Sequence, residues 1–481
     1  MPPSERPPGS EPMRSSSPDA AAGAGEIAAR LDRLPSSRAI WTIVILISAG
    51  GVFEFYDVFF TAYVAPGMVK TGLFTPQSLG FFASLQSIAV AGFGTFVFCT
   101  FAGLWLGVVA FGKAADRLGR KPAFVGALIW YMICTAIMAF QRSGEAINLW
   151  RLAAGVGFGV QLVTIDAYIC ELIPAGLRGR AFALNQCIAF AIVPVIALLA
   201  WRLVPRTILG LDGWRVVVLL GSAGAVVVWF LSSAIPESPR WLATRGRLAE
   251  AERILLDIER EVMREGKALP APASPVPETG GNRRHMFDQH YRKRTVMLSV
   301  FNAAQVIGFY GFNAWVPTLL IGRGVNVTDS LEYSFIIALA QPVGPALGAL
   351  FADRVERKSQ IIGGLIGMGM AMGMFARLSA PAALIAAGVV FTLAANVMSY
   401  AYHGYQAELY PTRIRAQAVG FVYSWSRIAA AFGGLATGYL LHTGGVVAVA
   451  AFIGAAMLVA ITMIGIFGPS TRGLTLEAIN R

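Results

Sequence analysis

A block of charged residues occurs twice in this chain, and the second copy follows the first by 237 positions. The first copy reads DRLGRK, at 116–121, and the second reads DRVERK, at 353–358. Another pair of blocks, YICELIPAGLR and YQAELYPTRIR, keeps the same offset. Matching charged blocks between apolar stretches predict two similar halves of a membrane bundle, an arrangement that suits alternating access to the two sides of a membrane.

Apolar residues dominate the composition: 56% of residues are hydrophobic and 14% are charged, far from the balance of a soluble domain. Runs of roughly 20 apolar residues are long enough to cross a bilayer as helices. We therefore expect an all-α membrane protein with twelve transmembrane helices in two six-helix repeats. The first six lie near residues 40–64, 89–111, 122–141, 147–170, 180–204 and 214–235. The second six lie near residues 295–321, 332–352, 360–379, 382–405, 416–441 and 445–468.

The segments outside these runs complete the domain organisation. Residues 1–38 are rich in Pro, Ser, Ala and Gly and are expected to be disordered. Six-helix bundles at 39–235 and 295–468 are separated by a linker at 236–294, which contains a helix-forming charged stretch, and residues 469–481 form a tail. Basic residues concentrate after the even-numbered helices, which predicts that both termini and the linker are cytoplasmic.

The charge distribution, the cysteine spacing and the glycine pattern argue against several classes of function. The net charge of +12 falls largely in the linker and beside helix ends, where attraction to anionic lipid heads explains it better than nucleic-acid binding. The four cysteines show no metal or disulfide spacing, and no glycine-rich stretch forms a nucleotide-binding fingerprint. We expect no cofactor, no metal, no ATPase or other enzyme activity, and a monomer in the bilayer.

Several motifs resemble one family. GKAADRLGRK, at 112–121, resembles the signature loop of the major facilitator superfamily, and its copy strengthens the match. PESPRWL, at 236–242, and RLAAGVGFG, at 151–159, resemble the sugar-porter and organic-ion-transporter branch. NAAQVIGFYGFNAWVPTLL, at 302–320, lacks the paired glutamines and tyrosines of sugar porters and is more similar to bacterial metabolite:proton symporters for aromatic acids or niacin-like compounds.

That resemblance implies the major facilitator fold, a bacterial-type inner membrane as the location, and transport of a small molecule. The favoured function is proton-coupled symport of a small organic anion, such as an aromatic acid, by alternating access. A sugar or polyol proton symporter and a drug or metabolite exporter are alternatives within the family. A membrane receptor that uses the fold as a ligand sensor is an alternative of another class.

Glu54 and Asp57 are candidates for proton coupling. Ionisable groups inside apolar spans cost at least about 2.5 kcal/mol and normally face a polar cavity or a partner. Their spacing places both carboxylates on one helical face. The resemblance pairs Asp57 with Arg151 as the proton switch, because a carboxylate beside a guanidinium stays ionised and gains proton affinity when separated from it. The alternative is a permanent structural pair.

Arg427 is the candidate counter-charge for an anionic substrate, because a guanidinium binds a carboxylate bidentately. The alternatives are a pair with a neighbouring helix's carboxylate or a side chain that reaches the membrane interface. Asp166 and His403 lie at equivalent repeat positions and are a possible second proton-sensitive pair. Amide and aromatic side chains are expected to complete the substrate cavity: Gln186, Gln305, Tyr310, Asn313, Tyr423 and Trp425.

The repeated charged blocks are interpreted as gates. Two equivalent ion-pair networks are expected, and each must break in every transport cycle, so neither can be very stable. The first contains Asp116, Arg117, Arg120, Glu171 and Arg178. The second contains Asp353, Arg354, Arg357, Glu408 and Arg415.

Overall fold

The computed structural model describes residues 18–79, 92–111, 117–272, 286–351, 355–410 and 412–471. Long helices account for most of this part of the chain. The first half contributes α2 (Arg38–Lys70), α5 (Gly92–Phe111), α7 (Arg120–Ala139), α8 (Gly144–Leu172), α9 (Arg178–Leu203) and α10 (Gly213–Leu231). The second half contributes α13 (Gln289–Asn313), α14 (Val316–Gly322), α15 (Val327–Ala338), α16 (Val343–Phe351), α17 (Arg357–Phe375), α18 (Pro381–Glu408) and α19 (Thr412–Thr462), followed by η4 (Met463–Phe467).

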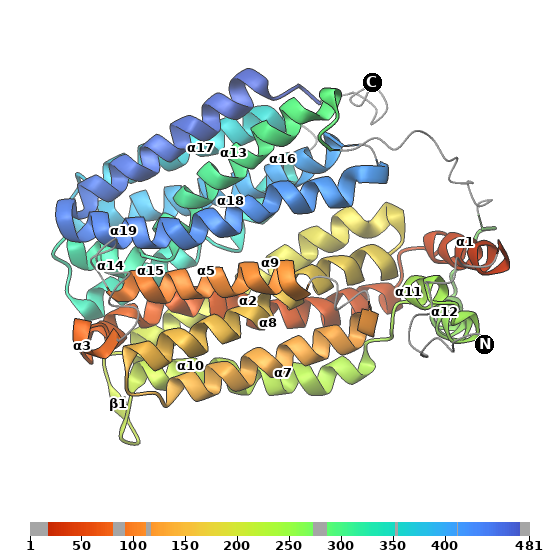
Figure 1. Ribbon diagram of the computed structural model, residues 1–481, viewed down its shortest axis with the longest axis horizontal. Helices are drawn as coiled ribbons and strands as arrows, with labels where there is room; N and C mark the ends of the chain where they lie inside the picture. Colours follow the sequence, from red (N-terminus) through yellow and green to blue (C-terminus); the bar gives the residue numbers. More distant parts are fainter. Residues whose placement is uncertain are drawn as a thin grey trace, which may run out of the picture.

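The helices form two groups, one from each half of the chain, whose long axes run in the same general direction (Figure 1). Among the described residues, eight helices are long and apolar enough to cross a membrane. The halves meet where α5 packs on α19 and where α9 packs on α15. The arrangement is the predicted all-α bundle of twelve membrane-spanning segments in two sets of six.

Four of the predicted spans differ in the structure. The run near 295–321 is divided between α13 and α14, and the run near 332–352 between α15 and α16. Proline lacks the N–H that continues a helix, and Pro317 at the start of α14 and Pro342 before α16 fit this effect. Conversely, the last two spans form one continuous α19 apart from a kink at Gly445, where φ is 63°, a conformation that glycine adopts at little cost.

The two halves repeat their contacts as well as their sequence. Arg120 pairs with Glu171 at 2.7 Å, and Arg357 pairs with Glu408 at 3.0 Å, at equivalent repeat positions. Lys121 Nζ donates to the carbonyl of Ser233 at 3.0 Å, just as Lys358 Nζ donates to that of Gly468 at 2.7 Å. Each lysine thereby ties the third helix of its half to the end of the sixth.

The two ends of the molecule differ. One end carries α11 (Pro239–Thr244) and α12 (Leu248–Arg264), and we call it the linker end. The opposite end carries a short antiparallel hairpin of β1 (Thr207–Ile208) and β2 (Leu211–Asp212), and we call it the hairpin end (Figure 1). The short α3 (Pro76–Leu79) also lies at the hairpin end. Single-turn 3-10 segments, η2 (Ala175–Leu177) and η3 (Ser232–Ala234), complete the described elements.

The expectation of disorder over 1–38 is wrong for its second part, since α1 (Pro18–Asp32) packs against α11 and α12 at the linker end. Leu31 and Leu34 are buried there. Arg30 and Arg33 both hydrogen-bond the Glu259 carboxylate, each with one donor at 2.7 Å. The sequence signal was weak because the segment is rich in small residues, and its order comes from contacts with a helix far along the chain. We call α1, α11 and α12 the linker cap.

Aromatic contacts join the two halves toward the hairpin end. Phe93 of α5 meets Trp315 with ring centroids 5.1 Å apart, and Trp201 of α9 stacks on Phe335 of α15 at 5.8 Å. At the linker end, the pairs of Arg120 with Glu171 and of Arg357 with Glu408 each stay within one half. The two halves are therefore closed against each other at the hairpin end.

Candidate functional site

Asp57 and Arg151 form a buried ion pair inside the first half. Asp57 lies in the middle of α2 and is 3% exposed, and Arg151 lies in α8 and is fully buried. Arg151 Nη1 donates to Asp57 Oδ2, and Nη2 donates to the Asp57 carbonyl at 2.7 Å. The structure thus brings together two of the residues that the sequence proposed for proton coupling.

Threonine hydroxyls and aromatic rings enclose this pair. Arg151 Nε donates to Thr100 Oγ1 of α5 and Nη2 donates to Thr61 Oγ1, both at 2.8 Å. Thr135 of α7 donates to Asp57 Oδ1 at 3.2 Å. The guanidinium also lies 4.8 Å from the ring centroid of Phe60. All three guanidinium nitrogens are therefore used, which offsets the cost of burying the charge.

Arg427 forms a second buried cationic site, in α19 of the other half. It is 5% exposed, its Nη2 donates to the Tyr423 hydroxyl at 2.9 Å, and its guanidinium lies 4.7 Å from the Tyr423 ring centroid. Tyr310 of α13 also interacts electrostatically with Arg427. Within the described parts of the chain, Arg427 Nε has no hydrogen-bond partner and no carboxylate lies within 4 Å of the guanidinium. A buried cation with an unused donor can accept an anion.

Acidic groups of the first half face Arg427 across the interface. Glu54 of α2 and Asp166 of α8 both interact with Arg427 electrostatically. Glu54 is 4% exposed, whereas Asp166 is exposed although it lies inside a membrane-spanning helix. Glu54 and Asp57 belong to different surroundings: Asp57 pairs with Arg151, and the opposite charge nearest Glu54 is Arg427.

His403 of α18 lies on the same side as Arg427. Its ring is 5.6 Å from that of Tyr423, and Arg427 acts on it electrostatically. Its Nδ1 lies 2.7 Å from the Ser399 carbonyl, and its Nε2 lies 3.2 Å from the Tyr402 hydroxyl. Both ring nitrogens are used within α18. Asp166 and His403 thus both face Arg427, and no direct contact between them is found among the described residues.

The other predicted cavity residues have different surroundings. Gln305 is buried in α13, and Gln186 of α9 is half-buried, with its Oε1 lacking a hydrogen-bond partner in the described structure. Asn313 is buried and accepts a hydrogen bond from Gln341 at 2.9 Å. Trp425 is 42% exposed and lies two residues from Arg427. Two residues turn a helix by about 200°, so Trp425 points away from Arg427.

Asn313 belongs to an amide network at the two helix breaks. Gln341, between α15 and α16, donates to Asn313, the last residue of α13, and accepts from Asn396 of α18 at 2.8 Å. Asn313 also donates to the Phe309 carbonyl at 2.9 Å. Both the nitrogen and the oxygen of the Asn313 side-chain amide are therefore hydrogen-bonded within the second half. Sequence reasoning missed this network because the helix breaks were not predicted.

The predicted gate residues are found only in part. Arg120 with Glu171 and Arg357 with Glu408 form pairs, as described above. Arg178 lies 3.5 Å from Asp32 of α1, and Arg117 is exposed. The remaining predicted gate residues, or their side chains, lie outside the described residues: Asp116, Asp353, Arg354 and Arg415.

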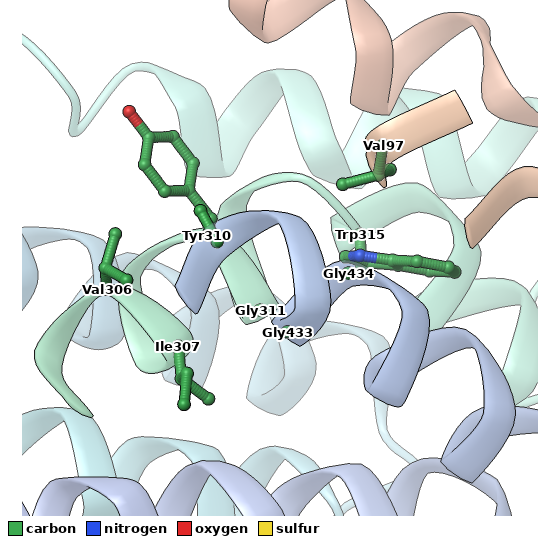
Figure 2. Close-up of a pocket in the computed structure, with 9 residues that line it drawn as sticks. Val97, Val306, Ile307, Tyr310, Gly311, Trp315, Gly433 and Gly434 are labelled. Carbon is green, nitrogen blue, oxygen red and sulfur yellow. The ribbon is translucent and has the colours of Figure 1, made fainter. Parts of the chain in front are cut away.

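A small apolar pocket lies between α5, α13 and α19 toward the hairpin end. It is lined by Val97, Tyr310, Trp315 and neighbouring residues, and its volume is about 10 Å³, near the minimum for one water molecule. In Figure 2, Val97 lies near Trp315, while the hydroxyl of Tyr310 points away from Trp315. This pocket is too small for an organic substrate, in agreement with closure at the hairpin end.

Among the described residues, no group of three or more His, Cys, Asp or Glu is placed to hold a metal ion.

The threonines around Asp57 and Arg151 were not proposed from the sequence. Thr61, Thr100 and Thr135 lie in apolar helices, where threonine usually bonds its own backbone. No sequence signal separates them from other threonines.

The comparisons with known proteins agree with this fold. The sugar (and other) transporter family model matches residues 43–481. A putative metabolite transport protein of Bacillus subtilis is 28% identical over 92% of this chain and 95% of the relative. The niacin transporter of Acinetobacter baylyi is 27% identical over 94% of this chain and 99% of the relative.

A solved structure extends the comparison to the fold. The xylose transporter of Escherichia coli, in a partially occluded inward open conformation, aligns with a TM-score of 0.72 at 20% identity, over 91% of this chain and 100% of that one. The twelve-segment arrangement in two halves is thus the major facilitator fold. The chain belongs to the sugar (and other) transporter family of the major facilitator superfamily, and it is a multi-pass membrane transport protein and not an enzyme.

Proposed function

We propose that this transporter is a proton-coupled symporter of a small organic anion, with an aromatic or related carboxylate as its substrate. One observation carries the proposal: Arg427 is 5% exposed, yet its Nε lacks a hydrogen-bond partner among the described residues. A buried guanidinium with a free donor binds a carboxylate through a charge-assisted hydrogen bond. The niacin transporter among the relatives carries a molecule of this class, which supports the proposal.

The surroundings of Arg427 favour a planar acid over a sugar. Tyr310, Tyr423 and His403 present rings and hydroxyls beside the guanidinium. Aromatic rings stack on planar groups, and a few polar atoms orient the ligand. The xylose transporter, which shares the fold, keeps a sugar symporter as the second candidate.

Asp57 and Arg151 supply the proposed proton coupling. While Arg151 pairs with Asp57, the carboxylate stays ionised, and when the pair separates, Asp57 takes up a proton. Helix movements between the two access states would make and break this contact. In this proposal the linker end is cytoplasmic and the described state is open toward that side.

Uptake into proteoliposomes tests the proposal. Labelled nicotinate and benzoate, their amides nicotinamide and benzamide, and xylose would each be offered with and without an imposed proton gradient. We expect gradient-driven accumulation of an acid and little of its amide. Accumulation of xylose alone would favour the sugar symporter, and accumulation that is independent of the gradient would contradict proton coupling.

A further inference from the structure

The three threonines around the buried pair use their hydroxyls differently. Thr100 donates to the Phe96 carbonyl of its own helix at 2.9 Å, and Thr61 donates to the Asp57 carbonyl, also in its own helix. Both accept from Arg151. A hydroxyl has one proton to donate, and Thr135 gives its proton to the Asp57 carboxylate on another helix. Thr135 is therefore the hydroxyl of the three that bonds the titrating group.

Both carboxylate oxygens of Asp57 are occupied. Arg151 donates to Oδ2, and Thr135 donates to Oδ1 at 3.2 Å. Thr135 is 2% exposed and Asp57 is 3% exposed, so water does not compete freely for these positions. If Arg151 withdraws during the transport cycle, the bond from Thr135 remains, because it comes from α7 and not from α8.

The other titratable groups that face Asp57 act through charge. Tyr131 and Cys134 of α7 interact with it electrostatically, as does Tyr56 of α2. Glu54 lies one helical turn away. Each of these groups is neutral or negative, so none stabilises the ionised carboxylate as Arg151 does.

We infer that Thr135 is a positioning residue of the proton site, whose hydroxyl favours the ionised form of Asp57 and so promotes proton release. The inference rests on the proposed coupling through Asp57. In the step concerned, a hydronium ion gives its proton to the Asp57 carboxylate, which makes the carboxyl group neutral and leaves a water molecule, and no other protein group changes charge. A bond donated to the carboxylate favours the ionised form, so its loss makes Asp57 hold the proton to higher pH.

Infrared titration of the purified protein in detergent tests this inference without a substrate. The absorption of the protonated carboxyl group would be followed with pH and assigned to Asp57 by its loss in Asp57→Asn. In Thr135→Val we expect the midpoint to move up by roughly one pH unit, a tenfold change in proton affinity. Thr135→Ser, which keeps the hydroxyl, should restore the wild-type midpoint.

Transport provides the second readout. In a proton-coupled carrier, the pH of half-maximal nicotinate or benzoate uptake should move up with the infrared midpoint in Thr135→Val. Thr392→Val is the matched control, because Thr392 is a buried threonine of α18 that bonds its own helix, at the Gly388 carbonyl. It should leave the infrared midpoint unchanged.

The outcomes separate this inference from the proposed function. An unchanged infrared midpoint in a well-folded Thr135→Val protein would overturn the role of Thr135 and leave the coupling proposal standing. A shifted midpoint would support Thr135 as a determinant of Asp57 titration. If uptake in the same protein did not depend on the proton gradient, the proposed symport would be contradicted.

Discussion

Arg151 and Arg427 are both buried guanidinium groups, yet their surroundings differ. Arg151 donates from all three nitrogens to fixed partners, including the carboxylate of Asp57. Arg427 donates to the Tyr423 hydroxyl and keeps an unused Nε. A satisfied ion pair suits a switch that changes state with the proton, whereas an unsatisfied cation suits a site that an anion completes. The residue-scale predictions follow from this difference.

Replacing Arg427 tests the charge of the substrate. Arg427→Gln should weaken binding of nicotinate or benzoate, whichever is transported, by about 2 to 5 kcal/mol, the range for removing one partner of a buried charge pair. Binding of the matching amide should change far less. Calorimetry with the purified protein would compare the two ligands. Equal losses for acid and amide in a monodisperse protein would assign Arg427 to the stability of the bundle.

Replacing Asp57 tests the coupling. Asp57→Asn cannot exchange a proton, so we expect gradient-driven accumulation to be lost while binding and counterflow exchange survive. Accumulation and counterflow would be measured in the same proteoliposomes. Thr392→Val serves as the control for loss of a buried polar contact elsewhere. Normal accumulation by Asp57→Asn would remove this carboxylate from the mechanism.

At the scale of secondary-structure elements, charged contacts join the helices of the linker cap to one another and join the cap to the first half. Glu259 of α12 accepts from Arg30 and Arg33, and Asp32 of α1 pairs with Arg240 of α11 at 2.7 Å. The Glu265 carboxylate, just after α12, accepts from the first backbone N–H groups of α2. The cap is therefore expected to move with the first half during any change between the access states.

The Glu259 contact predicts a pH dependence of the cap. Burial by itself raises the pKa of Glu259, but hydrogen bonds and charges of Arg30 and Arg33 outweigh burial and hold the pKa below its ordinary value. A carboxyl group with a lowered pKa in the folded state contributes stability above its unfolded pKa, roughly 4.3, and that stability is lost as the pH falls through the folded value. α1 should stay attached to α12 at neutral pH and loosen as the pH falls through the lowered pKa of Glu259.

A spin label at Glu26→Cys, an exposed position of α1, would report the mobility of the cap by electron paramagnetic resonance. Glu259→Gln should raise that mobility at pH 7, because it leaves two arginines without their carboxylate at a cost of about 1 to 3 kcal/mol. Glu261→Gln is the control, since Glu261 pairs only with the exposed Arg264 in the described structure. Equal mobility in both variants would show that the Glu259 contacts do not hold α1 in place.

For the whole molecule, the charge pattern predicts that the linker end faces the cytoplasm. In a background without the four native cysteines, Arg253→Cys of α12 and Leu209→Cys at the hairpin tip are both exposed. A membrane-impermeant maleimide should label position 209 in right-side-out vesicles and label position 253 only after the vesicles are opened. The reverse pattern would contradict the predicted orientation.

The two-half fold could be predicted from sequence because its signals are global: long apolar runs and a constant repeat offset. The pairing of Asp57 with Arg151 came from family resemblance, since the chain alone does not show which buried charges meet. Thr135 was not predictable, because Thr135 and Thr392 look alike in an apolar helix and differ only in what lies opposite. The order of α1 was missed because it depends on contacts with α12, more than 200 residues away.

The paired lysine contacts described above bear on how the chain is made. Lys121 reaches across 112 residues to Ser233, and Lys358 across 110 residues to Gly468, so each bond closes a half on itself. During synthesis the first bond becomes possible as soon as the sixth helix has left the ribosome. Domains tend to fold as units from the N-terminus. The first half can therefore fold in the bilayer while the second half is still being translated, and its folding does not depend on the last helix of the chain.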